Sequence, residues 1–135
     1  MEFHAIRNVA TKSASAPGGH YVQARSYGGL LHVSGQLPIG ADGNGDPNAA
    51  FEQQAQIAMM NVLAIVEAGG SSPNHILQVT AYIVGITNWP TFNNVYARLM
   101  GEARPARSVV PVPELHYGYQ VEIDAIAAIF DRDGD

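Results

Sequence analysis

The stretch NAAFEQQAQIAMMNVLAIVEA, residues Asn48–Ala68, decides the fold. Its apolar residues recur at spacings of three and four, which is the pattern of a helix with one buried face. Asp46 or Asn48 is placed to cap the start of this helix, and Gly69-Gly70 ends it. A helix of this kind has to bury its apolar face, so we expect it to cover one side of a β-sheet. The residues of this face are Phe51, Ala55, Ala58, Met59, Val62, Ile65 and Val66.

Strand-forming segments on both sides of this helix supply the sheet. They are short, rich in β-branched residues and bounded by Gly or Pro. Gly28 and Gly29 can both adopt positive φ, as the central positions of a two-residue hairpin turn require. The predicted strands are Phe3–Val9, Tyr21–Tyr27, Leu30–Gln36, Ile76–Val84, Arg107–Val112 and Tyr119–Phe130.

A second helix is expected before the strand Arg107–Val112. Thr87 or Asn88 is placed to cap it, Pro90 is tolerated in its first turn, and Gly101 ends it. The buried face of this helix is formed by Phe92, Val95, Tyr96 and Leu99. The order of elements predicts an α+β fold over residues 1–135, a single sheet with two helices on one face.

Alternation along the strands separates a core face from an open face. In the last strand Glu122 and Asp124 lie opposite its apolar residues, and in an earlier strand His32 and Ser34 lie opposite Leu31 and Val33. Gly35 permits either a bend or the close approach of a ligand. The residues expected on the core face are Leu77, Val79, Ala81 and Ile83 in one strand, and Val121, Ile123, Ala125, Ala127 and Ile129 in the last.

The composition argues against several functions. The chain has 135 residues, of which 47% are hydrophobic and 14% charged, so one core can form and a partner copy is expected to cover some apolar surface. A net charge of −5 with only 7 Lys and Arg residues gives no basic stripe for nucleic acid. The absence of cysteine excludes thiolate chemistry. No apolar run reaches the ~18–20 residues of a membrane-spanning helix, and no signal-peptide pattern opens the chain, so we expect a cytoplasmic protein.

The sequence predicts no metal site and no cofactor. The spacing Asp42-x-Asn44-x-Asp46 resembles the start of a calcium loop, but Pro47 replaces the required Gly and Gln53 the required Glu. Neither a nucleophile elbow nor a phosphate-binding glycine loop is present. No ligand spacing relates the five histidines, which are His4, His20, His32, His75 and His116.

An ordered set of short motifs runs through most of the chain. The set comprises Gly29–Gln36 (GLLHVSGQ), Gln54, Asn61, Glu67–Gly70 (EAGG), Val79-Thr80, Asn93, Tyr96, Pro105–Ser108 (PARS) and Val121–Ala127 (VEIDAIA). From about Tyr21 to Ile129 this arrangement resembles the Rid family (YjgF/YER057c/UK114), the reactive intermediate deaminases. The resemblance implies a fold like that of bacillar-type chorismate mutase, and a homotrimer with a central β-barrel and three clefts between subunits.

The resemblance also implies an activity, the hydrolysis of enamines and imines such as 2-aminoacrylate and 2-iminopropanoate to 2-keto acids and ammonia. By their match to the family pattern, Arg107 is expected to bind the substrate carboxylate and Glu122 to position or activate a water. The planar guanidinium of arginine suits bidentate binding of a carboxylate, and a desolvated glutamate can exchange protons near neutral pH. The same match implies that the pocket is lined by Tyr21, Ser34, Gly35 and Asn93.

The chain departs from the family pattern at several positions. Val109 stands where many members have a cysteine, and Gly19-His20-Tyr21 stands where Gly-Pro-Tyr is usual. The loop before the last strand is more aromatic than usual, and its residues His116, Tyr117 and Tyr119 form either a cleft rim or plain loop packing. These changes leave the reaction plausible and open the question of side-chain preference.

Simpler interpretations remain for single residues and for the function. Tyr21 is consistent with hairpin packing, Asn93 with a bond to backbone, and Asp124 with an interface or solvent role. Ser34 has no base arranged for it, which favours a structural hydroxyl over a nucleophile. The alternative functions are a deaminase of a larger catabolic intermediate such as 2-aminomuconate, and a non-catalytic protein that binds small carboxylates. A ribonuclease is the least favoured because the chain is acidic.

Overall fold

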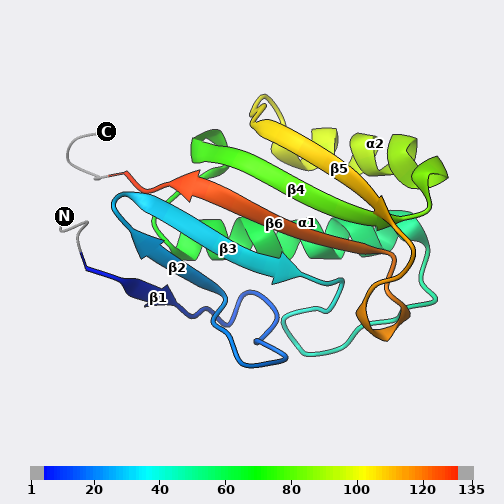
Figure 1. Cartoon of the computed structure of the whole chain (residues 1–135), viewed down its shortest axis with the longest axis horizontal. Coiled ribbons are helices and arrows are strands. Elements are labelled where there is room, and N and C mark those ends of the chain that lie inside the picture. Colours follow the sequence, from blue (N-terminus) through cyan, green and yellow to red (C-terminus); the bar gives the residue numbers. More distant parts are fainter. Residues whose placement is uncertain (1–4, 131–135) are drawn as a thin grey trace.

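The computed structural model describes residues 5–130 and contains six strands and two α-helices within them (Figure 1). Turns of 3₁₀ helix at Pro73–His75, Ile86–Asn88 and His116–Gly118 join some of these elements. The elements are β1 (Arg7–Val9), β2 (Ala24–Tyr27), β3 (Leu30–Gln36), α1 (Phe51–Ala68), β4 (Ile76–Val84), α2 (Trp89–Met100), β5 (Ala106–Val112) and β6 (Val121–Ala128).

All six strands form one mixed sheet in the order β1-β2-β3-β6-β4-β5. Only β4 and β5 pair in parallel, across the crossover made by α2, and the other four pairs are antiparallel. Gly28 and Gly29 form the β2–β3 turn with φ of 63° and 83°, which confirms the predicted hairpin. β5 lies at one edge of the sheet, so its outer side is unpaired within the described chain.

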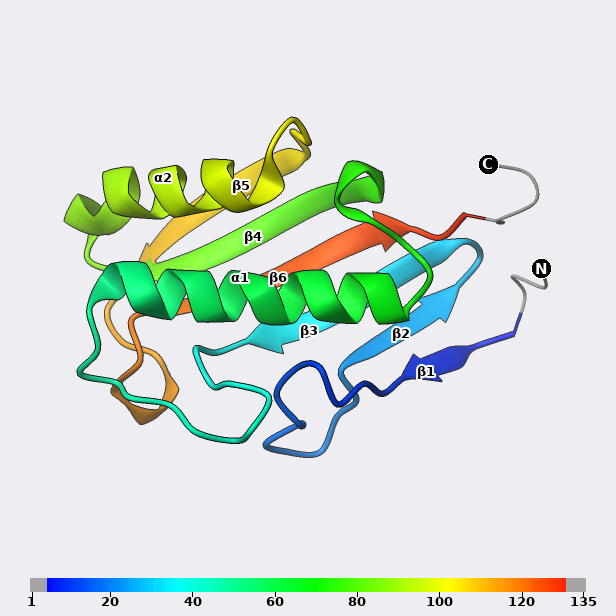
Figure 2. The ribbon, with the colours of Figure 1, turned by 180° about the vertical axis from the view of Figure 1, so that it is seen from behind.

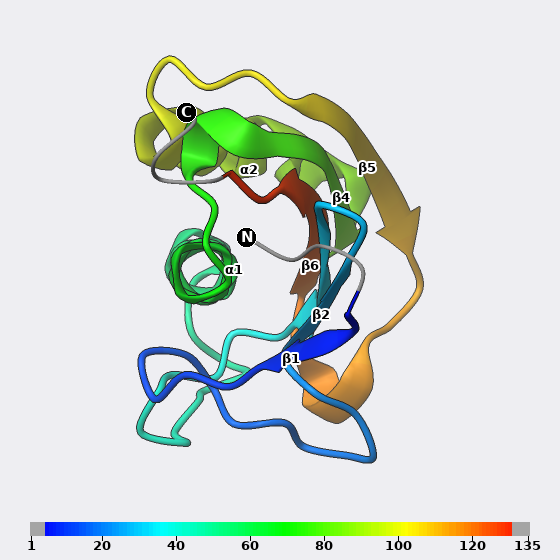
Figure 3. The ribbon, with the colours of Figure 1, turned by 90° about the vertical axis from the view of Figure 1, so that its left-hand side faces the viewer.

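Both helices pack on the same face of the sheet (Figures 2 and 3). The predicted apolar face of α1 is buried throughout, from Phe51 to Val66, against the inward residues of the strands. The inward residues of β6 (Val121, Ile123, Ala125 and Ala127) are buried below it, which leaves Glu122 and Asp124 on the uncovered face. These findings confirm the predicted α+β architecture.

The start of α1 differs from the prediction, because the helix begins at Phe51 and no side chain caps it. The Asp46 carboxylate accepts the Asn48 backbone N–H at 2.9 Å and so orders the preceding loop instead. Gln54 binds that loop through bonds from its amide to the carbonyls of Pro47 and Ala49. Its side-chain oxygen accepts the Gln120 N–H at 2.9 Å, which ties the first turn of α1 to the start of β6.

Three further expectations need correction. The Asn88 amide donates to the Val84 carbonyl at 2.9 Å, so it does not cap α2, which begins at Trp89. Leu77 is 49% exposed, because a register shift against β6 turns Ile76 inward in its place. Three strands are also shorter than predicted: 5–6 lie outside β1, 21–23 outside β2, and 119–120 and 129–130 outside β6. Residues 3 and 4 of the predicted first strand lie outside the described residues.

Candidate functional site

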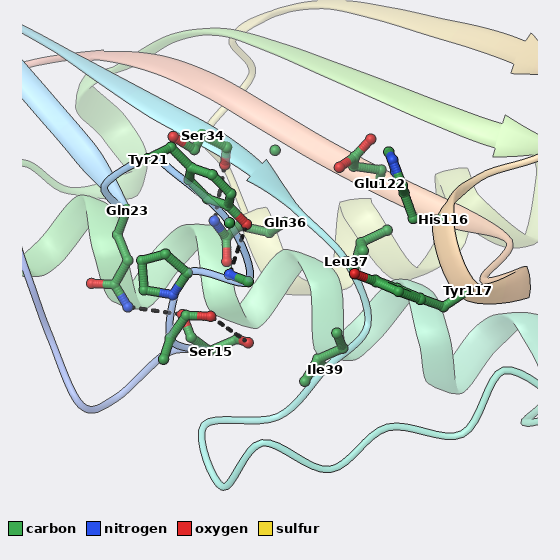
Figure 4. Close-up of a pocket in the computed structure, with 15 residues that line it drawn as sticks. Ser15, Tyr21, Gln23, Ser34, Gln36, Leu37, Ile39, His116, Tyr117 and Glu122 are labelled. Carbon is green, nitrogen blue, oxygen red and sulfur yellow. Dashed lines mark hydrogen bonds between the residues drawn. The ribbon is translucent and has the colours of Figure 1, made fainter.

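A cavity of about 460 Å³ opens beside the ends of β3 and β6, on the face of the sheet that the helices leave uncovered (Figure 4). Four of the predicted site residues line it: Tyr21, Ser34, Gly35 and Glu122. The loop after β3 adds Leu37 and Ile39, the loop before β6 adds His116 and Tyr117, and the segment 15–19 forms the remaining rim.

Gln23 holds this rim in place. Its side chain is 3% exposed, and its amide nitrogen donates to the carbonyls of Thr11 and Ser15 at 3.0 and 2.9 Å. Its amide oxygen accepts the Thr11 N–H at 2.7 Å. Because these bonds satisfy the buried amide, the loop from 11 to 19 is fixed over the cavity, with Tyr21 at its end. The Tyr21 hydroxyl accepts the Gly18 N–H at 3.2 Å, and half of the side chain remains exposed.

Ser34 has a structural hydrogen bond. Its hydroxyl donates to the Val22 carbonyl at 2.7 Å, and its backbone N–H donates to the Gln23 carbonyl at 2.9 Å. These contacts join the end of β3 to the segment before β2 beyond the point where regular pairing stops. With its proton directed to backbone, the hydroxyl oxygen is left as a hydrogen-bond acceptor that lines the cavity, which agrees with the interpretation of Ser34 as structural.

Gly35 makes room for Glu122. A Cβ atom added at position 35 would lie 2.9 Å from Oε2 of Glu122 and 3.0 Å from its Cδ. A contact this close would displace the carboxylate, since it is the far end of a flexible side chain. The absence of a side chain at Gly35 therefore leaves the space that the Glu122 carboxylate occupies.

The environment of Glu122 favours proton exchange. Burial raises the pKa of its carboxyl above the ordinary value, His116 lowers this pKa and Asp124 raises it. Figure 4 shows the imidazole of His116 facing the Glu122 carboxylate. Burial also raises the pKa of Asp124, the next outward residue of β6. A carboxyl with a raised pKa is a better base once ionised, and this suits it to activate water.

Arg107 and Asn93 lie at a different place. The Arg107 side chain extends from β5 toward α2, where its Nη1 donates to Oδ1 of Asn93 at 3.0 Å. Three aromatic rings surround the guanidinium, whose carbon is 4.8 Å from the ring centre of Tyr96, 5.6 Å from Trp89 and 5.8 Å from Phe92. Such cation–π contacts hold the cation in one orientation and leave its other N–H donors for a ligand.

Tyr96 is part of the surroundings of Arg107. It is 7% exposed, and its hydroxyl is the buried side-chain polar atom without a hydrogen-bond partner among the described residues. Burial raises the pKa of this phenol, and the nearby Arg107 lowers it. The hydroxyl is therefore neutral at ordinary pH and contributes packing around the guanidinium.

One copy of the chain does not join these two groups. Arg107 pairs in register with Val79, a core residue, and therefore projects toward the helices at the β5 edge. Glu122 pairs with Tyr82 and projects to the uncovered face of β6. Of the predicted site residues, the structure brings Tyr21, Ser34, Gly35 and Glu122 to one cavity and Arg107 and Asn93 to a cluster on the other face.

Some residues of these groups were not assigned by the sequence. Gln23 has no motif, and its role depends on a loop whose path only the structure gives. Trp89 stands in the first turn of α2, where it contacts Arg107 of a later strand. The interpretation of His116 and Tyr117 as cleft residues is favoured by their place in the cavity wall, whereas Tyr119 is 6% exposed and outside that wall.

Within residues 5–130 no cluster of three or more His, Asp or Glu side chains could hold a metal ion. No helix in that range is long and apolar enough to cross a membrane.

The fold and the cavity define a small α+β protein with a carboxylate at the end of its open sheet face. The sequence profile of the family described as endoribonuclease L-PSP matches residues 11–129. The chain therefore belongs to this family, the Rid (YjgF) family that the motifs indicated.

Named relatives are similar over almost their whole length. TdcF of Escherichia coli (strain K12), whose name describes a reactive intermediate deaminase, is 34% identical over 122 residues, or 88% of this chain and 94% of its own. A protein of Dermatophagoides farinae named 2-iminobutanoate/2-iminopropanoate deaminase is 32% identical over 123 residues, or 91% of this chain and 96% of its own. The crystal structure of E. coli TdcF with bound serine has a TM-score of 0.86 at 33% identity, over 92% of this chain and 99% of that one.

Proposed function

We propose that this protein hydrolyses reactive 2-imino acids and their enamine forms to 2-keto acids and ammonia. The observation that carries the proposal is a carboxylate of raised pKa, Glu122, facing a cavity with room for a small organic acid. The names of the relatives from E. coli and D. farinae support the same reaction type. The substrates proposed are 2-imino acids derived from single amino acids, of which 2-iminopropanoate is among the simplest.

The complete site is formed between two copies of the chain in a homotrimer with a central β-barrel. One copy supplies Arg107 and Asn93 from its β5 edge, and the next supplies the cavity with Glu122. This is supported by the placement of the two groups on opposite faces of one sheet and by the unpaired outer side of β5. Repeated head-to-tail contacts of this kind close into a ring when the rotation allows it.

The residues then have separate roles. Arg107 holds the substrate carboxylate, and Asn93 fixes the guanidinium by the bond at 3.0 Å. Glu122 takes a proton from water as the oxygen adds to the imine carbon. Glu122 passes that proton to the imine nitrogen, which gives the neutral carbinolamine. Glu122 then moves the hydroxyl proton of the carbinolamine to its nitrogen, so that ammonia leaves and the carbon keeps the oxygen as a ketone. Overall, one imine and one water give one keto acid and one ammonia, with no electron transfer.

A coupled assay tests the proposal. An L-amino-acid oxidase with catalase generates 2-imino acids from several amino acids, and semicarbazide traps the imine that survives. We expect this protein to speed keto-acid release and to reduce the trapped imine. Arg107→Ala should lose that effect, whereas Arg98→Ala should keep it, because Arg98 is an exposed arginine that bonds only Gln56 at 3.2 Å among the contacts seen. Unchanged trapping with folded wild-type protein, for every amino acid tried, would refute hydrolysis of small imines.

A second function is favoured by one finding, the serine bound in the crystal structure of TdcF. In this alternative the chain binds a small amino or keto acid without turning it over, and calorimetry would show saturable binding that depends on Arg107 with no rate enhancement. The other alternative, deamination of a larger intermediate such as 2-aminomuconate, would appear as turnover confined to bulky substrates.

A further inference from the structure

We propose that Tyr117, together with Tyr21 across the same cavity, forms an aromatic wall that selects 2-imino acids with an aromatic side chain. This inference rests on the proposed function and specifies its substrate class.

The backbone of Tyr117 is in an unusual conformation. Its φ of 62° and ψ of 14° lie in the left-handed region, and it is the non-glycine residue with positive φ among the described residues. A residue with a Cβ is destabilised there by about 1–2 kcal/mol relative to the right-handed conformation, so Gly or Asn is the usual choice. Strain of this kind persists where the surrounding structure holds the residue for another purpose.

Stability does not explain the choice of tyrosine. The Tyr117 side chain is 70% exposed, so little apolar area is buried to offset the backbone strain. Its neighbour Tyr119 is 6% exposed and contacts the Tyr117 ring edge to face, with ring centres 6.5 Å apart and an interplanar angle of 82°. The His116 ring lies 6.0 Å from it on the other side. The buried ring of Tyr119 thus supports the exposed ring of Tyr117, which lies in the cavity wall.

The ring of Tyr117 faces an apolar space. In Figure 4 it extends toward Leu37, with Glu122 above it and Tyr21 on the other side of the cavity. The ring of Tyr21 is itself 50% exposed, so both aromatic surfaces are open to a ligand. Leu37, Ile39 and Pro17 complete a lining that suits a planar apolar group.

The cavity is large for a three-carbon acid. Its volume is about 460 Å³, whereas a cavity of about 150 Å³ already holds a benzene ring. An imino acid whose reacting carbon lies beside Glu122 can therefore place an aromatic side chain between the two tyrosines. An alanine-derived imine would leave the same space to water, and it gains nothing from the aromatic wall.

The test compares phenylalanine-derived and alanine-derived imines, generated in the same coupled assay, as a ratio of kcat/KM values. We expect the ratio to favour the aromatic imine in the wild type and to fall about three- to tenfold in Tyr117→Asn, as for the loss of one aromatic contact. Asn suits the left-handed backbone, so this variant should fold. Tyr117→Phe keeps the ring and should keep the ratio. A wild type that favours the alanine imine, or a ratio unchanged in Tyr117→Asn, would overturn the inference while leaving the deaminase function intact.

A binding measurement separates this inference from the reaction. Phenylpyruvate and pyruvate are stable analogues of the two products, and calorimetry gives the ratio of their Kd values without any turnover. One outcome is that no imine is hydrolysed, that phenylpyruvate binds more tightly than pyruvate, and that Tyr117→Asn removes this difference in Kd. That outcome would support the aromatic wall and refute the deaminase function. If the two acids bind equally, or neither binds, the aromatic wall is wrong as well.

Discussion

The two functional groups of this chain are built in opposite ways. The cavity around Glu122 is bounded largely by loops, and burial raises the pKa of the Glu122 carboxyl. The Arg107 cluster lies on regular elements, where one amide and three rings fix the guanidinium. In the proposed reaction the first group exchanges a proton and admits the substrate side chain, and the second holds the substrate carboxylate. We therefore propose a division between chemistry and binding.

Substitution of the two charged residues should separate these roles with the largest effects. Glu122→Gln should lower kcat about 10²- to 10⁴-fold with little change in KM, as for the loss of a general acid–base group. Arg107→Ala should lower kcat/KM by about 10²- to 10³-fold, mainly through KM, because the substrate carboxylate loses a charged partner. Steady-state kinetics on one imine measures both. The division would fail if Arg107→Ala changed only kcat or Glu122→Gln only KM.

Gly35→Ala should have a smaller effect on the reaction and little effect on folding. The new methyl would meet the Glu122 carboxylate, which can move away because it ends a flexible side chain. A displacement of about 1 Å costs up to about 10²-fold in rate, so we expect a 10- to 100-fold loss in kcat. Thermal unfolding should stay within a few degrees of wild type. Full activity in Gly35→Ala would show that the position of the carboxylate is not critical.

His116→Gln should move the pH dependence of the reaction. The charge of His116 lowers the pKa of Glu122, so its removal leaves this pKa further above the ordinary value. Because the ionised carboxylate is the base, the acid limb of the kcat/KM profile should shift to higher pH in the variant, with activity on the alkaline plateau reduced less than about threefold. A shift to lower pH, or none, would separate His116 from the chemistry of Glu122.

Asp124→Asn should give the smallest effect, on stability. Burial raises the pKa of Asp124 in the folded chain, so the fold binds this proton more tightly than the unfolded chain does. Wild type therefore loses stability as pH rises from the unfolded value of 3.8 through the raised folded value, and the variant does not. Urea unfolding at equal protein concentration should show the variant more stable at pH 7 and equal to wild type below pH 3.8. Greater stability of wild type at pH 7 would contradict this.

The sequence predicted the core of this protein better than its site. Periodicity located the buried faces of α1 and β6 because burial repeats with the helix and strand period. It missed the inward turn of Ile76, since a register shift leaves no mark on composition. The start of α1 was predicted too early, whereas α2 does begin after Asn88. Neither Asp46 nor Asn88 caps its helix through a side-chain bond, because both bond to nearby backbone instead.

The family motifs chose residues that lie in two groups, but they could not separate the groups in space. In the sequence, Glu122 and Arg107 are each a charged residue in a segment rich in apolar residues, and nothing there marks the side of the sheet that each one faces. Only strand pairing shows that they face opposite sides of the sheet. The sequence also did not predict the positive φ of Tyr117, because a single aromatic residue in a loop does not reveal its backbone conformation.

The most direct test of the composite site is to mix two inactive variants. Arg107→Ala and Glu122→Gln chains would be co-expressed with different tags, and mixed oligomers purified through both tags would be assayed for imine hydrolysis. If one copy supplies Arg107 and the next supplies Glu122, every mixed trimer has one intact site in three, so the purified mixed trimers should show about one third of wild-type activity. Activity no higher than that of either variant alone, in oligomers shown to contain both chains, would contradict a site shared between copies.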